Sequence, residues 1–184
     1  MRSTTLFKLF ASRRSVDLPH LLYRIAGEQA RLPVFYIRFG VADSFDGRFD
    51  LLVLHVHLLV RRLGREQPDG KRLAQEVFDV MLADLDQGLR LAGVGDVGIG
   101  KRVKKMSHAY YGRAVAYDGA LDAGDTAMLE AAVRRNVYRD RPDAGQAPGA
   151  LAAYVLACRS ALDAAPRAAF DEASFRFPAP AEEA

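Results

Sequence analysis

Two nucleotide-binding patterns overlap in the stretch GVGDVGIGKRVKKM at residues 93–106. The pattern G-x-G-x-x-G begins at Gly93, and the pattern G-x-x-x-x-G-K begins at Gly95. Both patterns hold a phosphate group only where a β-strand enters the loop and a helix leaves it. Here the preceding residues have the apolar spacing of a helix, and Arg102 stands where a Ser or Thr would bind magnesium. The sequence therefore argues against nucleotide binding.

The glycine-rich stretch instead predicts the turn of a helical hairpin. Gly93 or Gly95 can end the first helix in a left-handed conformation, which glycine adopts without steric cost. Asp96 can cap the second helix, because its side-chain oxygen can accept a hydrogen bond from a free backbone N–H group. We expect a tight hairpin whose second helix begins with basic residues.

Basic residues crowd the start of this second predicted helix, at residues 97–121. Cations are unfavourable near a helix N-terminus, where the macrodipole is positive, so their placement there favours a binding role. We expect an anionic partner: RNA, lipid headgroups or an acidic protein segment. The alternative is a solvated face without a partner. The partner-binding candidates are Lys101, Arg102, Lys104, Lys105 and Arg113.

Other residues capable of chemistry form no recognisable catalytic or metal-binding set. His55 and His57 are two positions apart, or about 200° on a helix, so they cannot hold one metal ion together. We expect both to be packing residues, and Cys158 to be a buried thiol. Asp79 and Asp86 lie on the polar face of a predicted helix, where we expect salt bridges; an enzyme site that joins them to a histidine is the alternative. The sequence predicts no catalytic residue, no cofactor and no metal.

The elements that carry these residues are all predicted to be helices. Apolar residues recur every three or four positions along most of the chain, and no segment shows convincing strand alternation. The nearly all-apolar segment at residues 48–63 belongs in the centre of a bundle. The fold class is therefore all-α, a single-domain bundle of six or seven helices with no sheet. The predicted helices lie near residues 18–30, 33–40, 48–63, 71–92, 97–121, 126–140 and 148–162.

Both ends of the chain differ in composition from the predicted bundle. Residues 1–17 predict a flexible basic N-terminus, in which Asp17 can cap the first helix. Residues 18–165 form the predicted helical domain. Residues 166–184 are acidic and rich in alanine and proline, so we expect a tail that is disordered or lies over the surface.

Composition restricts the class of protein further. The chain has 184 residues, of which 50% are hydrophobic, and a net charge of +3, as is usual for a globular domain. A single cysteine excludes an intrachain disulfide and is compatible with a reducing compartment. No secretory signal is apparent, and the longest apolar run, at residues 51–60, covers about 15 Å as a helix, half of a bilayer core. We therefore expect that this run does not span a membrane.

Three segments together resemble the ubiquinol–cytochrome c chaperone family, a bacterial and mitochondrial group related to a yeast cytochrome b assembly factor. They are DGRFDLLVLHVHLLVRRL, AQEVFDVMLADLDQGLRLAGVGDVGIGKRVKKMSHAYYGR and RRNVYRD, and the resemblance extends over residues 18–162. Its most specific part runs from Asp46 to Tyr117, where an F-D-x-M-x-x-D-x-D helix precedes G-V-G-D-x-G-x-G-K-R-V-K-K-M.

The resemblance implies a non-enzymatic assembly chaperone for respiratory complex III, ubiquinol–cytochrome c reductase, that binds newly made cytochrome b. It implies a place in the cytoplasm or at the cytoplasmic face of the inner membrane, near the membrane surface or the ribosome. It transfers no catalytic residue, and we expect no DNA partner. The oligomeric state and the need for a partner protein stay open.

A chaperone for a membrane protein needs an exposed apolar groove, since its client must be shielded before insertion. Aromatic residues can line such a groove, and packing in the core is the alternative role for each of them. A basic helical RNA- or ribosome-binding module is the alternative hypothesis for the whole chain. The aromatic candidates are Phe35, Tyr36, Phe39, Tyr110, Tyr111 and Tyr117.

Overall fold

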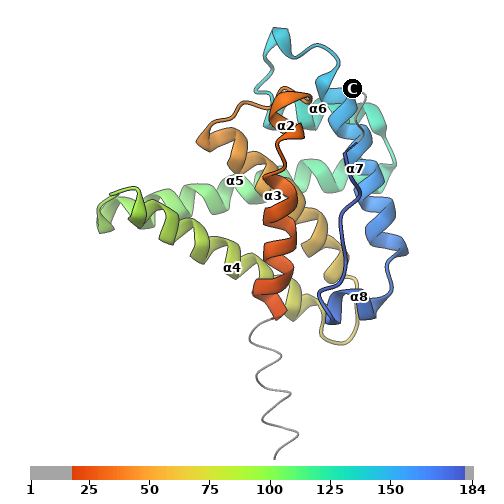
Figure 1. Ribbon diagram of the computed structural model, residues 1–184, viewed down its shortest axis with the longest axis horizontal. Coiled ribbons are helices and arrows are strands. Elements are labelled where there is room, and N and C mark those ends of the chain that lie inside the picture. The colour runs from red at the N-terminus through yellow and green to blue at the C-terminus, as the bar shows by residue number, and fades with distance from the viewer. Residues whose placement is uncertain (1–17, 181–184) are drawn as a thin grey trace, which may run out of the picture.

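The most apolar helix of the chain occupies the centre of the fold. This helix is α3 (Phe45–Leu63), whose residues 49–59 are all buried. It contacts α4 (Gly70–Leu91), α5 (Asp96–Ala123) and α7 (Ala147–Ala164), as Figure 1 shows. A helix that is apolar around its whole circumference is stabilised most when other helices surround it. The prediction of a central helix here is confirmed.

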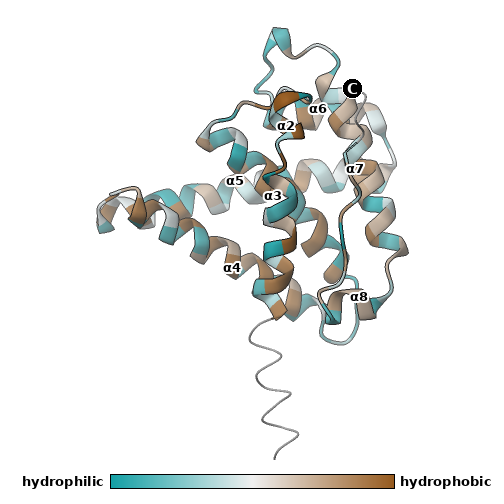
Figure 2. Cartoon of the chain, viewed as in Figure 1, coloured by the Kyte–Doolittle hydropathy of each residue, from teal (hydrophilic) through white to brown (hydrophobic). Residues whose placement is uncertain are grey.

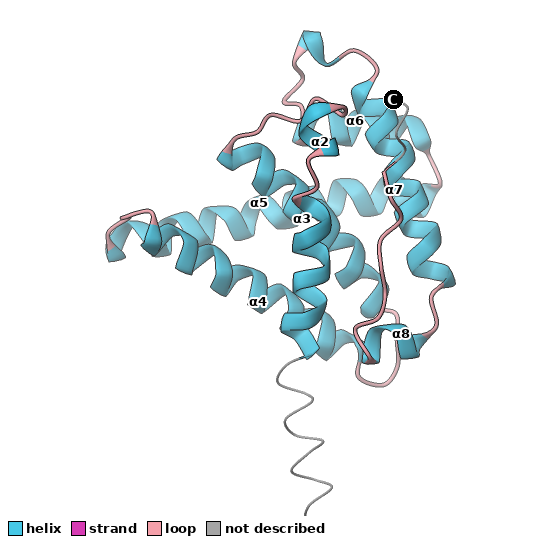
Figure 3. Ribbon diagram, viewed as in Figure 1, coloured by secondary structure: helices cyan, strands magenta, loops and turns pink. Residues whose placement is uncertain are grey.

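The computed structural model describes residues 18–180, and every regular element in that range is a helix (Figure 3). The all-α prediction is therefore confirmed. No helix in the described range is both long enough and apolar enough to cross a bilayer. Besides α3, α4, α5 and α7, the elements are the N-terminal helix (residues 18–30), α2 (Val34–Ile37), α6 (Thr126–Asn136), the 3-10 helix η1 (Pro142–Ala144) and α8 (Arg167–Asp171).

Helices α4 and α5 form a long hairpin whose tip projects from the rest of the bundle (Figure 1). Gly93 has φ of 78°, in the left-handed region, so the predicted glycine turn is confirmed. The prediction that Asp96 caps α5 is wrong: Gly95 is the N-cap and Asp96 is the first helical residue. The Asp96 carboxylate is instead bound by Arg90 of α4, whose Nη1 lies 2.6 Å away across the turn.

Side-chain caps determine where two of the other helices begin. Ser44 Oγ accepts a hydrogen bond from the backbone N–H of Gly47 at the start of α3. Gly47 itself cannot carry a side chain, because a Cβ there would lie 2.0 Å from the carbonyl oxygen of Ala42. Asp125 caps α6 by accepting a hydrogen bond from the backbone N–H of Met128.

The C-terminal segment contributes to the core. Phe170 of α8 is fully buried, and Phe175 and Phe177 are 6% and 7% exposed. The Phe177 ring packs edge-on against the His55 ring at 5.3 Å. The expectation of a disordered or superficial tail from residue 166 is therefore wrong for residues 166–177. The prediction relied on the Ala/Pro-rich composition and overlooked three phenylalanines. Burial of their side chains is favourable, because it removes apolar surface from water.

A chain of hydrogen bonds crosses the core beside this segment. His55 Nδ1 donates to the carbonyl oxygen of Leu51 at 2.8 Å, so Nε2 is free to accept from the Tyr154 hydroxyl at 2.9 Å. Gln29 Nε2 donates to the same hydroxyl at 2.8 Å. Burial lowers the pKa of His55 to about 4. The buried thiol of Cys158 lies in the same helix as Tyr154, and burial raises its pKa to about 12. His55 and Cys158 are thus packing residues, as predicted.

Candidate functional site

Four cations in the first turns of α5 form an exposed group without counter-ions. Lys101, Arg102, Lys104 and Lys105 are all exposed, and none forms an ion pair with a carboxylate of residues 18–180. Some exposed arginines elsewhere, such as Arg72, are paired with an acid of their own helix. We call these four residues of α5 the basic cluster. Its charges are available to an anionic partner.

Arg113 does not belong to the exposed face on which the sequence placed it. Its side chain is 14% exposed, and its Nη2 donates to Asp50 at 2.6 Å. Arg139 Nη2 donates to the other oxygen of Asp50 at 2.9 Å. Asp50 is fully buried, and this burial raises its pKa to about 6 against the opposing effect of both guanidinium groups. Sequence reasoning missed Asp50, although one acid inside an apolar helix signals a buried ion pair.

The two arginines that bind Asp50 line a pocket between α3, α4 and α5. This basic pocket has a cavity volume of about 490 Å³. Arg102 and Lys105 of the basic cluster line it together with Arg113 and Arg139, and Asp46 is the acid at its edge. Its apolar lining consists of Phe45, Phe49, Leu89, Met106 and Ala109. The pocket therefore combines positive charge with hydrophobic surface.

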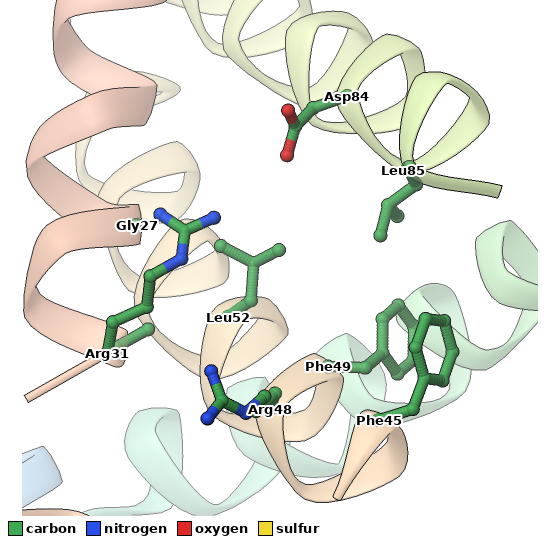
Figure 4. A pocket seen from close by; sticks show the side chains of 10 residues that line it. Gly27, Arg31, Phe45, Arg48, Phe49, Leu52, Asp84 and Leu85 are labelled. Atoms are coloured by element: carbon green, nitrogen blue, oxygen red, sulfur yellow. The ribbon is translucent and has the colours of Figure 1, made fainter. Parts of the chain in front are cut away.

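A second, smaller cavity of about 190 Å³ shares Phe45 and Phe49 with the basic pocket. It lies between the N-terminal helix, α3 and α4. Figure 4 shows Leu52 of α3 and Asp84 of α4 pointing toward this cavity, together with Arg31, which directly follows the N-terminal helix. Phe45, which is 61% exposed, stands at the junction of the two cavities.

The aromatic candidates separate into core residues and surface residues. Phe35 and Phe39 are at most 1% exposed and pack against Tyr154, so their predicted role in an exposed groove is wrong. Tyr110 is 3% exposed and is likewise mainly a core residue. Tyr117, fully buried, shares this role. The remaining two candidates, Tyr36 and Tyr111, are half-buried and 53% exposed respectively.

Tyr111 lies in a groove on the side of α5 away from the basic pocket. This aromatic groove, between α3, α4 and α5, has a cavity volume of about 520 Å³. Tyr110 contributes the small part of its ring that is exposed, and the Phe78 ring lies 4.6 Å from it. The other apolar lining residues are Val60, Ala74, Ala114 and Val115, and the basic ones are Arg61, Arg65 and Lys71. The groove thus joins an apolar surface to a basic end.

Polar contacts fix one wall of the aromatic groove. His57 Nε2 lies 3.0 Å from Asp118 Oδ1, which also accepts from Arg61 Nη1 at 2.6 Å. Desolvation raises the pKa of Asp118, but the hydrogen bonds from His57 and Arg61 outweigh it and hold the pKa below its usual value. Arg61 also binds Asp122 at 2.6 Å. His57 is 4% exposed, so its predicted packing role is confirmed.

Little in the arrangement of the described residues supports the alternative of an enzyme site. No group of three His, Cys, Asp or Glu side chains within residues 18–180 is arranged to hold a metal ion. Asp79 is hydrogen-bonded to Gln75, and Asp86 is paired with Arg90. Asp86 thus forms the predicted salt bridge within α4, whereas Asp79 forms a hydrogen bond with a neutral amide of the same helix. The glycine stretch follows a helix rather than a strand, which leaves the nucleotide-binding patterns without their structural context.

The profile of the family described as ubiquinol-cytochrome C chaperone matches residues 38–177. The chain belongs to this family. The matched range includes all residues that line the basic pocket and the aromatic groove.

A crystal structure of the Cbp3 homolog from Brucella abortus superimposes on the chain with a TM-score of 0.86 and 35% sequence identity. This likeness covers 98% of the present chain and 100% of the crystallised one. Ubiquinol-cytochrome c reductase complex assembly factor 1 of mouse is 25% identical over 65% of this chain and 40% of its own length. The Drosophila melanogaster protein of that name is 26% identical over 82% of this chain and 60% of its own length. The chain therefore spans less than two thirds of the length of these two assembly factors.

Proposed function

We propose that the protein is a non-enzymatic assembly chaperone for ubiquinol–cytochrome c reductase and that it binds newly made cytochrome b. The observation that carries the proposal is membership of the chaperone family across residues 38–177. The similar mouse and fly proteins are named as assembly factors of the same reductase complex. The proposed place of action is the cytoplasm or the cytoplasmic face of the inner membrane.

The aromatic groove is the proposed binding site for an apolar segment of the client. Phe78, Tyr111 and Val115 present hydrophobic surface there. A membrane segment outside the bilayer gains free energy when such a surface covers it. Lys71 at the basic end of the groove can pair with an acidic residue that flanks the segment.

Deletion of the gene tests the proposed function. We expect less assembled complex III, measured by native gel electrophoresis and ubiquinol–cytochrome c reductase activity, with other respiratory complexes unchanged. Affinity purification of the tagged protein from solubilised membranes is expected to recover cytochrome b. Normal complex III in a clean deletion strain would refute the proposal.

Two matched substitutions test whether the aromatic groove holds the client. Val115 is 74% exposed in the groove, and Met128 is 46% exposed on α6, outside it. Val115→Asp buries a charge against the client and is expected to abolish recovery of cytochrome b. Met128→Asp introduces the same charge on an exposed residue elsewhere and is expected to preserve recovery. Equal recovery of cytochrome b with both variants would show that the client binds elsewhere than in the groove. It would not affect the proposal that rests on family membership.

The alternative of an RNA- or ribosome-binding module rests on the basic cluster alone. Family membership does not favour it. Binding of purified protein to RNA, with a steep salt dependence that Lys101→Glu and Lys104→Glu remove, is the result that would support it.

A further inference from the structure

The two most exposed large hydrophobic side chains of the described residues lie together at the tip of the α4–α5 hairpin. Leu91, the last residue of α4, is 82% exposed, and Val97, in the first turn of α5, is 81% exposed. Figure 2 shows hydrophobic segments at this projecting end. Single exposed apolar residues need no explanation, but two on one protruding turn form a small apolar tip.

The basic cluster begins directly behind this apolar tip. Lys101 and Lys104 follow Val97 by four and seven residues, so they lie on the same side of α5. The helical rise places them about 6 and 10 Å behind Val97 along the axis. Interfacial helices bury apolar groups by about 5–10 Å at the boundary of headgroups and acyl chains. A tip that enters a bilayer to this depth brings both lysines to the level of the lipid phosphates.

We propose that the tip of the α4–α5 hairpin anchors the protein to the surface of an anionic lipid bilayer. Leu91 and Val97 enter the boundary of the acyl chains, and the basic cluster binds the headgroups. The charge of the tip fits this occupant, because its one acid, Asp96, is already paired with Arg90 and the four cations of the cluster have no carboxylate partner in residues 18–180.

The shape and chemistry of the tip favour a membrane over RNA or a protein. Single-stranded RNA is commonly held by bases that stack on aromatic side chains, whereas the two exposed hydrophobic residues of the tip are aliphatic. A stable protein interface buries about 800 Å² on each partner, which one narrow turn cannot supply. A bilayer accepts a convex tip, and each cation near its surface adds to the affinity.

This inference goes beyond the proposed function, because lipid binding needs neither cytochrome b nor the aromatic groove. It can be measured with the purified full-length protein. Co-sedimentation is performed with vesicles of phosphatidylcholine alone and with vesicles that contain about 30% phosphatidylglycerol, at several salt concentrations. We expect binding to the anionic vesicles that weakens with salt, and at least tenfold weaker binding to the neutral ones.

Paired variants separate the contributions of charge and apolar contact. Lys101→Gln with Lys104→Gln is expected to weaken binding about fivefold for each lysine, the equivalent of about 1 kcal/mol each, or about 25-fold together. Leu91→Asn with Val97→Asn is expected to weaken it at least tenfold. The matched controls are Arg24→Gln with Arg72→Gln for charge and Ile37→Asn for apolar exposure, all at exposed positions outside the hairpin tip. Thermal unfolding of each variant verifies that it is folded.

Three results would overturn the proposal. The first is equal binding to neutral and anionic vesicles. The second is loss of binding that is no greater in the tip variants than in the controls, which would assign the membrane contact to another part of the chain. The third is tight RNA binding that the lysine variants abolish and the Leu91 and Val97 variants leave unchanged, without vesicle binding. Recovery of cytochrome b by the same variants shows whether the proposed function survives independently.

Discussion

His55 makes the stability of the protein depend on pH in a way that one substitution can isolate. Its imidazole is fully buried, and its pKa is lowered to about 4 by desolvation, against an ordinary value of 6.5. Between these two values the unfolded chain binds a proton that the folded chain does not. Stability is therefore fully retained above about pH 6.5 and is lost as the pH falls toward 4.

The size of the effect follows from the two pKa values. The difference of 2.5 between 6.5 and 4 sets a ceiling of about 3.4 kcal/mol, at about 1.36 kcal/mol for each pKa unit. Integration from pH 7 to pH 5 gives a loss of about 2 kcal/mol in the free energy of unfolding, since little of the folded state is protonated at pH 5.

His55→Gln removes the titration and keeps an acceptor for the Tyr154 hydroxyl. Urea unfolding followed by circular dichroism at pH 7, 6 and 5 gives the free energy of unfolding for each protein. We expect the variant to be less stable at pH 7 and to lose about 2 kcal/mol less than the wild type on acidification to pH 5. Other groups, such as Asp50, titrate in both proteins and cancel in this difference.

His108→Gln provides the control, because it replaces a histidine that is exposed on α5 rather than buried in the core. Its profile is expected to run parallel to that of the wild type. If the His55→Gln profile is also parallel to the wild type, within about 0.5 kcal/mol, the buried imidazole is not the titrating group and the reasoning is refuted.

Three further substitutions test a buried ion pair, the hairpin turn and the packing of the C-terminal segment. Arg113→Met leaves Asp50 with Arg139 alone and is expected to lower the free energy of unfolding by about 3–5 kcal/mol in urea titration, whereas a cost below 1 kcal/mol would show that Arg139 suffices. Gly93→Ala places a side chain in the left-handed turn and is expected to cost about 1–2 kcal/mol, seen as a lower melting temperature; an unchanged melting temperature would contradict the strain argument. Phe177→Ala is expected to cost about 3–5 kcal/mol in urea, while a residue that only lies on the surface would cost less than about 0.5 kcal/mol.

Much of the secondary structure could be predicted from the sequence, because helix periodicity and caps act over a few residues. The spacing of apolar residues located the long helices, and Gly93 located the hairpin turn, since a left-handed conformation is a local requirement. The prediction that Asp96 caps α5 failed because of a contact between two helices. Arg90 of α4 reaches across the turn and binds the Asp96 carboxylate that we expected to cap the helix.

The candidate site was predictable only in part. The exposure of Lys101 and Lys105 follows from their position opposite the apolar residues of their own helix, such as Val103, so the sequence was sufficient. The two sides of α5, with the basic pocket and the aromatic groove, depend on how α3 and α4 pack against it. That packing brings together residues that are far apart in the chain, and the apolar spacing within each helix does not indicate it.

The sequence by itself determined the helical character of the chain, its hairpin and its family, since these depend on local spacing and on recognisable motifs. Only the tertiary structure decided which polar and aromatic side chains are buried. Arg113 turns inward because the Asp50 carboxylate, 63 positions away, is buried beside it. Phe177 is buried in the core because its ring packs against His55 and the apolar residues around it. Burial is a property of contacts between distant segments, and such contacts exist only once the chain has folded.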